Sequence, residues 1–313
     1  MSQQSFDDFA KQVFQLYEAG EYAQAYDFTT QEAGNFPGEV GHTDFWRACL
    51  AALLGRTETA LQILKDWVAA GYWVAERRMR DEPDLESLNG LPVYEAIVAI
   101  CRERHKEAEA QGAPKLITLL PDQQAQSYPL LIAMHGNNGN AHGSVSYWHP
   151  VVARGWILAV PQSSQIFMPD AYVWNDLERA TREIQSHYAS LIHEYPINIG
   201  RVIIGGFSMG AGLSIRFSMN GAIPACGFIA MGPYIPDVDT LEPFLAASKD
   251  RGLRGVILVG DQDKHCYDTS LKVAEMLNAH DIPCKLEVYP AMGHEFPPDF
   301  PQKLEEAIAF ILA

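Results

Sequence analysis

The 313-residue sequence lacks any apolar run that approaches the length of a membrane-spanning helix. Its first residues carry neither the basic nor the apolar segment of a secretory signal, so none is expected. Cysteines are few, since the sequence has five. Because an odd number of cysteines cannot all form disulfides within one chain, a location in the reducing cytoplasm is favoured. Because no Cys, His, Asp or Glu cluster has metal-ligand spacing, we expect neither a metal nor another cofactor.

Basic residues are also scarce. The 23 Lys and Arg residues stand against 39 Asp and Glu residues, which gives a formal net charge of −16. Such a surface repels phosphate groups, so neither a nucleic acid nor an anionic membrane is expected as a partner. The hydrophobic content of 48% is typical of a globular protein, and the length favours two domains.

Residues 1–113 show almost no strand pattern and are expected to form a helical domain. Apolar side chains recur at helical spacing between Phe6 and Tyr17, and Gly20 interrupts them before the pattern resumes. The segment that starts at Gly20 recurs at Gly55, a period of 55 − 20 = 35 residues, which resembles the tetratricopeptide repeat. Such a region offers a surface for a protein partner or for self-association. Paired helices that form only a structural appendage explain the same residues.

A charged helix end followed by Gln111-Gly-Ala-Pro114 marks the domain boundary, and residues 114–313 form the second predicted domain. Here short apolar strands alternate with helices, which predicts an α/β domain with a mostly parallel sheet covered on both faces. Strands are expected at 116–120, 129–134, 156–160, 202–204, 225–231, 255–260 and 285–289, and helices at 176–195, 211–219 and 304–312.

A strand-turn-helix pattern surrounds Ser208. The apolar run 202–204 breaks into Gly206-Phe-Ser-Met-Gly210, and small helix formers follow. This is G-x-S-x-G in the context where the motif exposes a serine hydroxyl on a sharp turn, and its glycines leave room for that turn. The following helix points its N–H groups at the serine, so the N–H of Met209 is expected to stabilise an oxyanion. Ser208 is therefore the predicted nucleophile.

Acidic and histidine side chains follow two later strands. Asp261 and Asp263 come after the strand at 255–260, and His294 comes after the strand at 285–289. Functional groups gather at the carboxyl ends of strands in open α/β sheets, so these side chains are expected near Ser208. We favour Asp263 over Asp261 because it sits farther out on the loop that must reach the histidine.

With the order Ser208, Asp263, His294, residues 115–313 resemble the α/β-hydrolase superfamily, near its phospholipase/carboxylesterase and dienelactone-hydrolase-like branches. The resemblance implies acyl transfer: His294 takes the proton of Ser208, and Asp263 orients the imidazole. It also implies a second oxyanion N–H from Asn137, with Asn138 as the alternative.

Aromatic side chains near the strand ends are candidates for a substrate pocket, although core packing explains them equally well. They are Trp148, Phe167, Tyr172, Trp174 and Tyr234. The loops carry no cluster of Arg or Lys to bind an anionic group, which favours a small neutral ester and a carboxylesterase-type serine hydrolase. Three alternatives stay open: a serine peptidase, a thioesterase, and a tetratricopeptide-like scaffold attached to a weakly active hydrolase fold.

Overall fold

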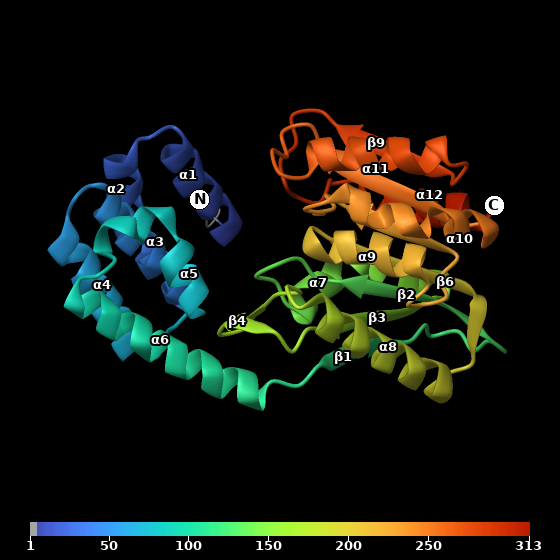
Figure 1. Ribbon diagram of the computed structural model, residues 1–313, viewed down its shortest axis with the longest axis horizontal. Coiled ribbons are helices and arrows are strands. Elements are labelled where there is room, and N and C mark those ends of the chain that lie inside the picture. Colours follow the sequence, from blue (N-terminus) through green and yellow to red (C-terminus); the bar gives the residue numbers. More distant parts are fainter. Residues whose placement is uncertain (1–4) are drawn as a thin grey trace. The chain divides into compact units, whose positions relative to one another are not determined.

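The computed structural model describes residues 5–313, which divide into two compact units (Figure 1). Among the described residues, the helical unit is 5–111 together with Phe167–Pro169, and the sheet unit is Gly112–Ile166 together with Asp170–Ala313. The first four residues of the predicted helical domain lie outside the described residues.

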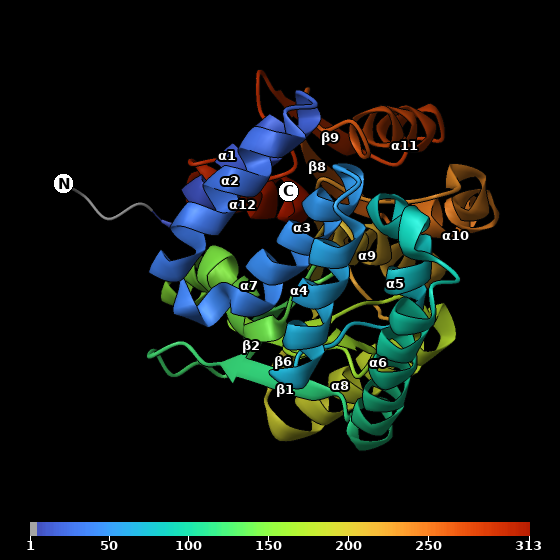
Figure 2. The ribbon, with the colours of Figure 1, turned by 90° about the vertical axis from the view of Figure 1, so that its left-hand side faces the viewer.

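Two helical hairpins open the helical unit (Figure 2). Helices α1 (Phe6–Glu18) and α2 (Tyr22–Glu32) form the first, and α3 (Val40–Leu53) and α4 (Thr57–Ala69) form the second. Gly20 and Gly55 turn the chain between the paired helices with φ of 76° and 70°, a conformation that costs glycine little. The remaining elements are η1 (Ala33–Asn35), η2 (Pro37–Glu39), α5 (Glu76–Asp81), η3 (Pro83–Leu88) and α6 (Pro92–Gln111). The predicted helical region is confirmed, and the tetratricopeptide resemblance stays a prediction.

Aromatic side chains fill the core of the helical unit. Phe9, Trp67 and Tyr94 are buried. The indole N–H of Trp67 donates to the Gly41 carbonyl at 2.9 Å, and the Tyr94 hydroxyl donates to the Met79 carbonyl at 2.7 Å. These buried polar atoms are therefore satisfied, which keeps the aromatic burial favourable.

The sheet unit is built on seven strands in the order β1-β3-β2-β6-β7-β8-β9. Strand β1 pairs antiparallel with β3, and the other neighbours pair in parallel. The strands are β1 (Lys115–Leu119), β2 (Tyr128–Met134), β3 (Ile157–Gln162), β6 (Ile197–Phe207), β7 (Gly227–Met231), β8 (Arg254–Gly260) and β9 (Cys284–Tyr289), and β4 (Ile166–Met168) and β5 (Ala171–Tyr172) form a separate pair. The predicted mostly parallel α/β sheet is confirmed.

Helices cover both faces of this sheet. They are α7 (Ala141–Trp148), η4 (His149–Arg154), α8 (Leu177–Glu194), α9 (Met209–Asn220), η5 (Val238–Phe244), α10 (Leu245–Asp250), α11 (Tyr267–Ala279) and α12 (Phe300–Leu312). Helices α7 and α12 pack on one face, and α8, α9 and α11 pack on the other. Alternate strand residues point to the two layers, so each strand reads as a continuous apolar run.

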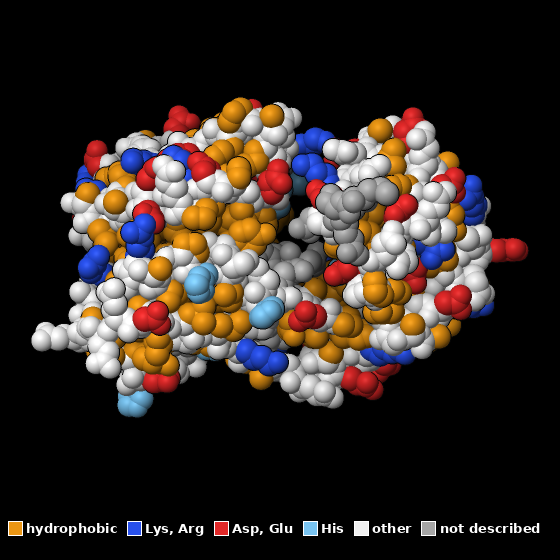
Figure 3. Space-filling view, turned by 180° about the vertical axis from the view of Figure 1, so that it is seen from behind, with side chains coloured by type: hydrophobic (Ala, Val, Ile, Leu, Met, Phe, Trp, Pro, Cys, Tyr) orange, Lys and Arg blue, Asp and Glu red, His pale blue; other side chains and the backbone are white. Residues whose placement is uncertain are grey.

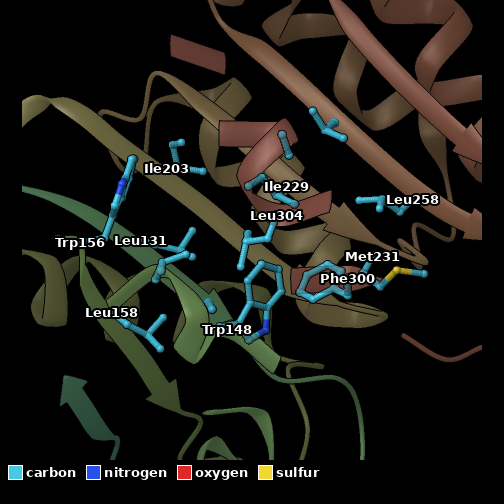
Figure 4. Packing of buried hydrophobic residues seen from close by; sticks show 14 of the residues in the cluster. Leu131, Trp148, Trp156, Leu158, Ile203, Ile229, Met231, Leu258, Phe300 and Leu304 are labelled. Carbon is cyan, nitrogen blue, oxygen red and sulfur yellow. The ribbon is translucent and has the colours of Figure 1, made fainter. Parts of the chain in front are cut away.

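The layer under α7 and α12 is centred on Trp148 (Figure 4). Its ring meets the ring of Phe300 edge-on, with centroids 5.1 Å apart, and Leu131, Ile203 and Leu304 lie in the same layer. Gly205 makes room for it, because a Cβ at that position would lie 2.8 Å from the Trp148 ring. This packing anchors the carboxyl end of β6, where the predicted nucleophile follows.

Acidic and basic side chains are interspersed on the face of the sheet unit seen in Figure 3. Among the described residues, no helix is both long and apolar enough to cross a membrane.

Candidate active site

The turn between β6 and α9 holds Ser208 in a strained backbone conformation. Its φ of 55° and ψ of −118° are unusual for a residue with a side chain. The Ser208 N–H donates to the Met231 carbonyl at 2.9 Å, and its carbonyl accepts the N–H groups of Gly212 and Tyr234, both at 3.0 Å. The neighbouring strand and the first turn of α9 therefore hold the strained residue in place. Helix α9 begins at Met209, so its first N–H groups point toward the serine.

The glycines of the motif are required by close backbone contacts. A Cβ on Gly206 would lie 2.3 Å from the Gly210 carbonyl, and a Cβ on Gly210 would lie 2.5 Å from the carbonyl oxygens of Met134 and His135. No side chain fits at those distances. The sharp turn and its close approach to the end of β2 thus depend on glycine at both positions.

The loops after β8 and β9 bring together Asp263 and His294. The Nδ1 atom of His294 lies 2.6 Å from Oδ2 of Asp263, and the other oxygen, Oδ1, accepts the N–H groups of His265 and Cys266 at 3.3 and 3.1 Å. The Asp263 side chain is 1% exposed, whereas that of His294 is 36% exposed. A buried carboxylate thus holds one edge of a ring whose other parts reach solvent.

Burial raises the pKa of Asp263, but the hydrogen bond and the charge of His294, together with two backbone N–H groups, outweigh burial and lower it overall. Asp263 is therefore an anion at neutral pH. Asp261 has a different place: its Oδ1 accepts the Ala291 N–H at 2.8 Å. This bond ties the loop after β9 to the loop after β8.

Phe207 and Gly232 both lie against the Asp263–His294 pair. The sequence did not predict either of them as a site residue. The Phe207 ring lies against the His294 ring with centroids 4.6 Å apart, which puts the imidazole next to the residue that precedes Ser208. Gly232 follows β7 with φ of 52°, and a Cβ there would lie 3.1 Å from His294 Nδ1 and 3.2 Å from Asp263 Oδ2. Inspection of the end of the strand at 225–231 would have found Gly232.

Replacing Gly232 by alanine is expected to lower kcat for hydrolysis by about 10–100-fold, because the new methyl group crowds the hydrogen bond between Asp263 and His294. Steady-state kinetics measure the loss. Gly252→Ala is the matched control, since Gly252 also has a positive φ, 67°, but has open space around it. A Gly232→Ala protein with the same kcat as Gly252→Ala would show that crowding of the Asp263–His294 bond does not limit the reaction.

The loop after β2 contains the predicted oxyanion residues. Asn137 and Asn138 are exposed, and Asn138 adopts φ of 59° in a turn closed by the bond from the Gly139 N–H to the Gly136 carbonyl at 3.1 Å. A Cβ on Gly136 would lie 3.2 Å from the Cβ of Ser208, so this loop runs beside the predicted nucleophile.

His135 supports that loop from inside the core. Its Nδ1 lies 2.8 Å from the Gly136 carbonyl, and Nε2 accepts the Ser163 N–H at 3.3 Å. The ring stacks on Trp174 with centroids 4.7 Å apart, and the Trp174 indole N–H donates to the His135 carbonyl at 2.9 Å. The fully buried ring is thus a neutral structural group that fixes the end of β2.

Burial lowers the pKa of His135 to about 4 from 6.5. Between these two pH values the unfolded chain binds a proton that the folded chain excludes. The free energy of unfolding therefore decreases as the pH is lowered, by about 3 kcal/mol at pH 4 relative to neutral pH. We expect His135→Asn, which cannot titrate, to have a flatter dependence of unfolding free energy on pH than the wild type. Urea unfolding from pH 7.5 to 4.5 tests this. Parallel curves for the two proteins would refute it.

The five predicted pocket residues lie in different places. Trp148 and Trp174 are core side chains, 0% and 2% exposed, which corresponds to the core alternative for these aromatics. Phe167 belongs to the helical unit, where its carbonyl accepts the Ala75 N–H at 2.8 Å. Tyr172 lies near His135, with ring centroids 6.5 Å apart. Tyr234 is 38% exposed, and its backbone N–H donates to the Ser208 carbonyl at 3.0 Å. Tyr172 and Tyr234 are the two that lie next to the serine and its loop.

Among residues 5–313, two groups of side chains have the composition of a metal site. In the sheet unit, Asp263, Cys266 and His294 each offer a ligand atom, and these atoms lie within 4.8 Å of one another. In the helical unit, Cys49, Glu82 and Asp84 do the same.

A mostly parallel sheet, the strained turn at Ser208 after β6 and a buried Asp263–His294 pair after β8 and β9 together have the architecture of an α/β-hydrolase. The chain matches the phospholipase/carboxylesterase family over residues 123–312 and an A/B hydrolase-like N-terminal domain over residues 5–109. It therefore belongs to the phospholipase/carboxylesterase family. A comparison with curated proteins finds no match.

Solved structures share this architecture. An uncharacterized protein from Bacillus cereus is 28% identical, with 99% of this chain and 100% of that chain covered and a TM-score of 0.58. A carboxylesterase from Bacillus cereus is 15% identical over 66% of this chain and 99% of its own, with a TM-score of 0.51. An acyl-protein thioesterase 2 from Zea mays is 16% identical over 64% and 99%, also with a TM-score of 0.51. The last two support the fold of the sheet unit.

Proposed function

We propose that the protein is a serine hydrolase that cleaves small neutral carboxylic esters through an acyl-enzyme on Ser208. The observation that carries the proposal is the hydrogen bond of 2.6 Å between Asp263 and His294, with the His294 ring against Phe207, the residue before the strained serine. A nucleophile, a base and a group that orients the base are the three roles that acyl transfer needs.

In the proposed mechanism, Nε2 of His294 accepts the proton of Ser208 as Oγ attacks the ester carbonyl. The anion of Asp263 keeps the other proton on Nδ1 and stabilises the imidazolium that forms. The N–H groups of Met209 and of Asn137, or of Asn138 as the alternative, stabilise the oxyanion at the start of α9. His294 then protonates the leaving alcohol, and water releases the acid by the same steps in reverse order. Tyr172 and Tyr234 are proposed to contact the substrate.

Thioesters and peptides react through the same three groups, and one solved structure with this fold, from Zea mays, is described as an acyl-protein thioesterase 2. A matched panel separates the alternatives: p-nitrophenyl esters from acetate to laurate, an acyl thioester, and an acyl p-nitroanilide. We expect the highest kcat/KM for short p-nitrophenyl esters, which are the small neutral esters of the proposed function. A higher kcat/KM for the thioester or the anilide would assign the protein to the corresponding alternative. No turnover of any member by folded protein would favour the scaffold alternative.

The helical unit is proposed to serve specificity, a partner protein or self-association instead of chemistry. Ser208, Asp263 and His294 all belong to the sheet unit, which has its own core. Removal of residues 1–113 is expected to keep p-nitrophenyl acetate hydrolysis within about tenfold while the chain-length preference or the oligomeric state changes. Kinetics and light scattering measure both effects. A folded truncated protein that no longer hydrolyses acetate esters would contradict this assignment.

A further inference from the structure

Three ligand types that zinc prefers meet at the Asp–His pair. The carboxylate of Asp263, the thiol of Cys266 and the imidazole of His294 each place one ligand atom within 4.8 Å of the other two. Asp263 and Cys266 lie in the β8–α11 loop, and His294 lies in the β9–α12 loop. Because His294 is far from the other two in the sequence, no short motif predicts the three residues as a site. Cys266 has no role in the proposed chemistry, although the residue is 1% exposed and its backbone N–H donates to Oδ1 of Asp263 at 3.1 Å.

We propose that Asp263, Cys266 and His294 form an inhibitory site for a soft divalent cation such as Zn²⁺. The site goes beyond the proposed esterase function, because it assigns a ligand that turns the enzyme off. Binding depends only on these three side chains, whereas the inhibition rests on the proposed function.

The geometry suits a tetrahedral ion after small movements. Bonds of about 2.0–2.3 Å keep the ligand atoms of a zinc ion about 3.3–3.7 Å apart. A pair of ligand atoms at the 4.8 Å limit would have to close by about 1 Å, and the pair His294 Nδ1 and Asp263 Oδ2 must open from 2.6 Å by about 0.7–1 Å. The buried Asp263 and Cys266 fix one side, while the His294 side chain, 36% exposed, gives the ion access and supplies the movement.

The second cluster, Cys49, Glu82 and Asp84, is a weaker candidate. Arg78 Nη2 already lies 2.6 Å from Glu82 Oε2, and the Tyr17 hydroxyl donates to Asp84 Oδ1 at 2.8 Å. A metal ion there would have to displace a guanidinium group.

Binding changes the protons of the site in a defined way. Bonds form from the ion to the carboxylate oxygen, to Sγ and to Nδ1. The S–H bond of Cys266 breaks and its proton goes to the solvent, while the proton of Nδ1 leaves and Nε2 gains one, so the imidazole stays neutral. With a proton on Nε2, His294 no longer accepts the proton of Ser208. One proton is released for each ion bound.

The test compares Cys266→Ser with the wild type and with Cys226→Ala, a control at a cysteine that is more exposed and outside the cluster. Serine keeps a polar hydrogen but is a poor ligand for a soft ion. Two measurements on the full chain are needed. One is the thiolate-to-cobalt charge-transfer absorption on titration with Co²⁺, which requires no activity. The other is inhibition by Zn²⁺ of p-nitrophenyl acetate hydrolysis, with each rate normalised to the same protein in chelator.

We expect the cobalt band in the wild type and in Cys226→Ala and its loss in Cys266→Ser. The concentration of Zn²⁺ for half inhibition is expected to rise at least about tenfold in Cys266→Ser alone, and Mg²⁺ at the same concentrations is expected not to inhibit. Unchanged zinc inhibition in Cys266→Ser, or no thiolate band in the wild type, would overturn the site. A cobalt band in a protein that hydrolyses no ester would support the metal site and refute the proposed function.

Discussion

Replacing Ser208 by alanine is expected to lower kcat/KM for ester hydrolysis by about 10⁴-fold or more, because the variant has no oxygen nucleophile at the turn. Oxyanion donors and binding alone retain only a small fraction of catalysis when a nucleophile is removed. The measurement is steady-state hydrolysis of p-nitrophenyl acetate.

Ser146→Ala, at an exposed serine on α7, is the matched control and is expected to retain full activity. Thermal unfolding checks that both variants fold. A Ser208→Ala protein with more than a tenth of wild-type activity would place the nucleophile elsewhere.

Replacing Asp263 by asparagine is the change with the second largest expected effect, a loss in kcat of about 10³-fold or more. The amide has no charge to stabilise the imidazolium, and its NH₂ group favours the wrong tautomer of His294. Because KM depends mainly on substrate contacts, the loss is expected in kcat and not in KM. Kinetics across pH 6–9 measure it.

Asp261→Asn provides a close comparison, since it removes a charge two residues away on the same loop. Its side-chain oxygen is retained and still accepts the Ala291 N–H, so a loss of less than about tenfold is expected. Equal losses for the two variants would mean that the negative charge of the loop, and not the contact with His294, supports the reaction.

The sequence is sufficient to predict the fold class because its signals are local. Each strand of the parallel sheet is a short apolar run, and the predicted runs match β2, β7, β8 and β9 to within two residues. The turn at Ser208 is also encoded locally, since Gly206 and Gly210 are the residues that its backbone contacts require. Strand β6 is longer than predicted: it begins at Ile197, opposite Tyr128 of β2.

Other features depend on contacts between distant segments. Asp261 and Asp263 are two residues apart after the same strand. The sequence offers only their positions on the loop to choose between them, whereas the backbone turn from the Asp263 N–H to the Gly260 carbonyl directs the two side chains to different partners. Trp148 and Tyr234 are both aromatic residues near strand ends, yet one is buried under α12 and the other is exposed beside the serine. Their burial is decided by tertiary packing, which spacing does not encode.

The central claim is that Ser208 is an activated nucleophile, and a fluorophosphonate probe tests it most directly. Attack of an activated serine oxygen on phosphorus expels fluoride and leaves a stable phosphonate ester, which peptide mass mapping locates. We predict one label per chain, on the peptide that contains Ser208, and a strong loss of labelling in Asp263→Asn. No label on folded protein, or a label on another residue, would contradict the proposed mechanism.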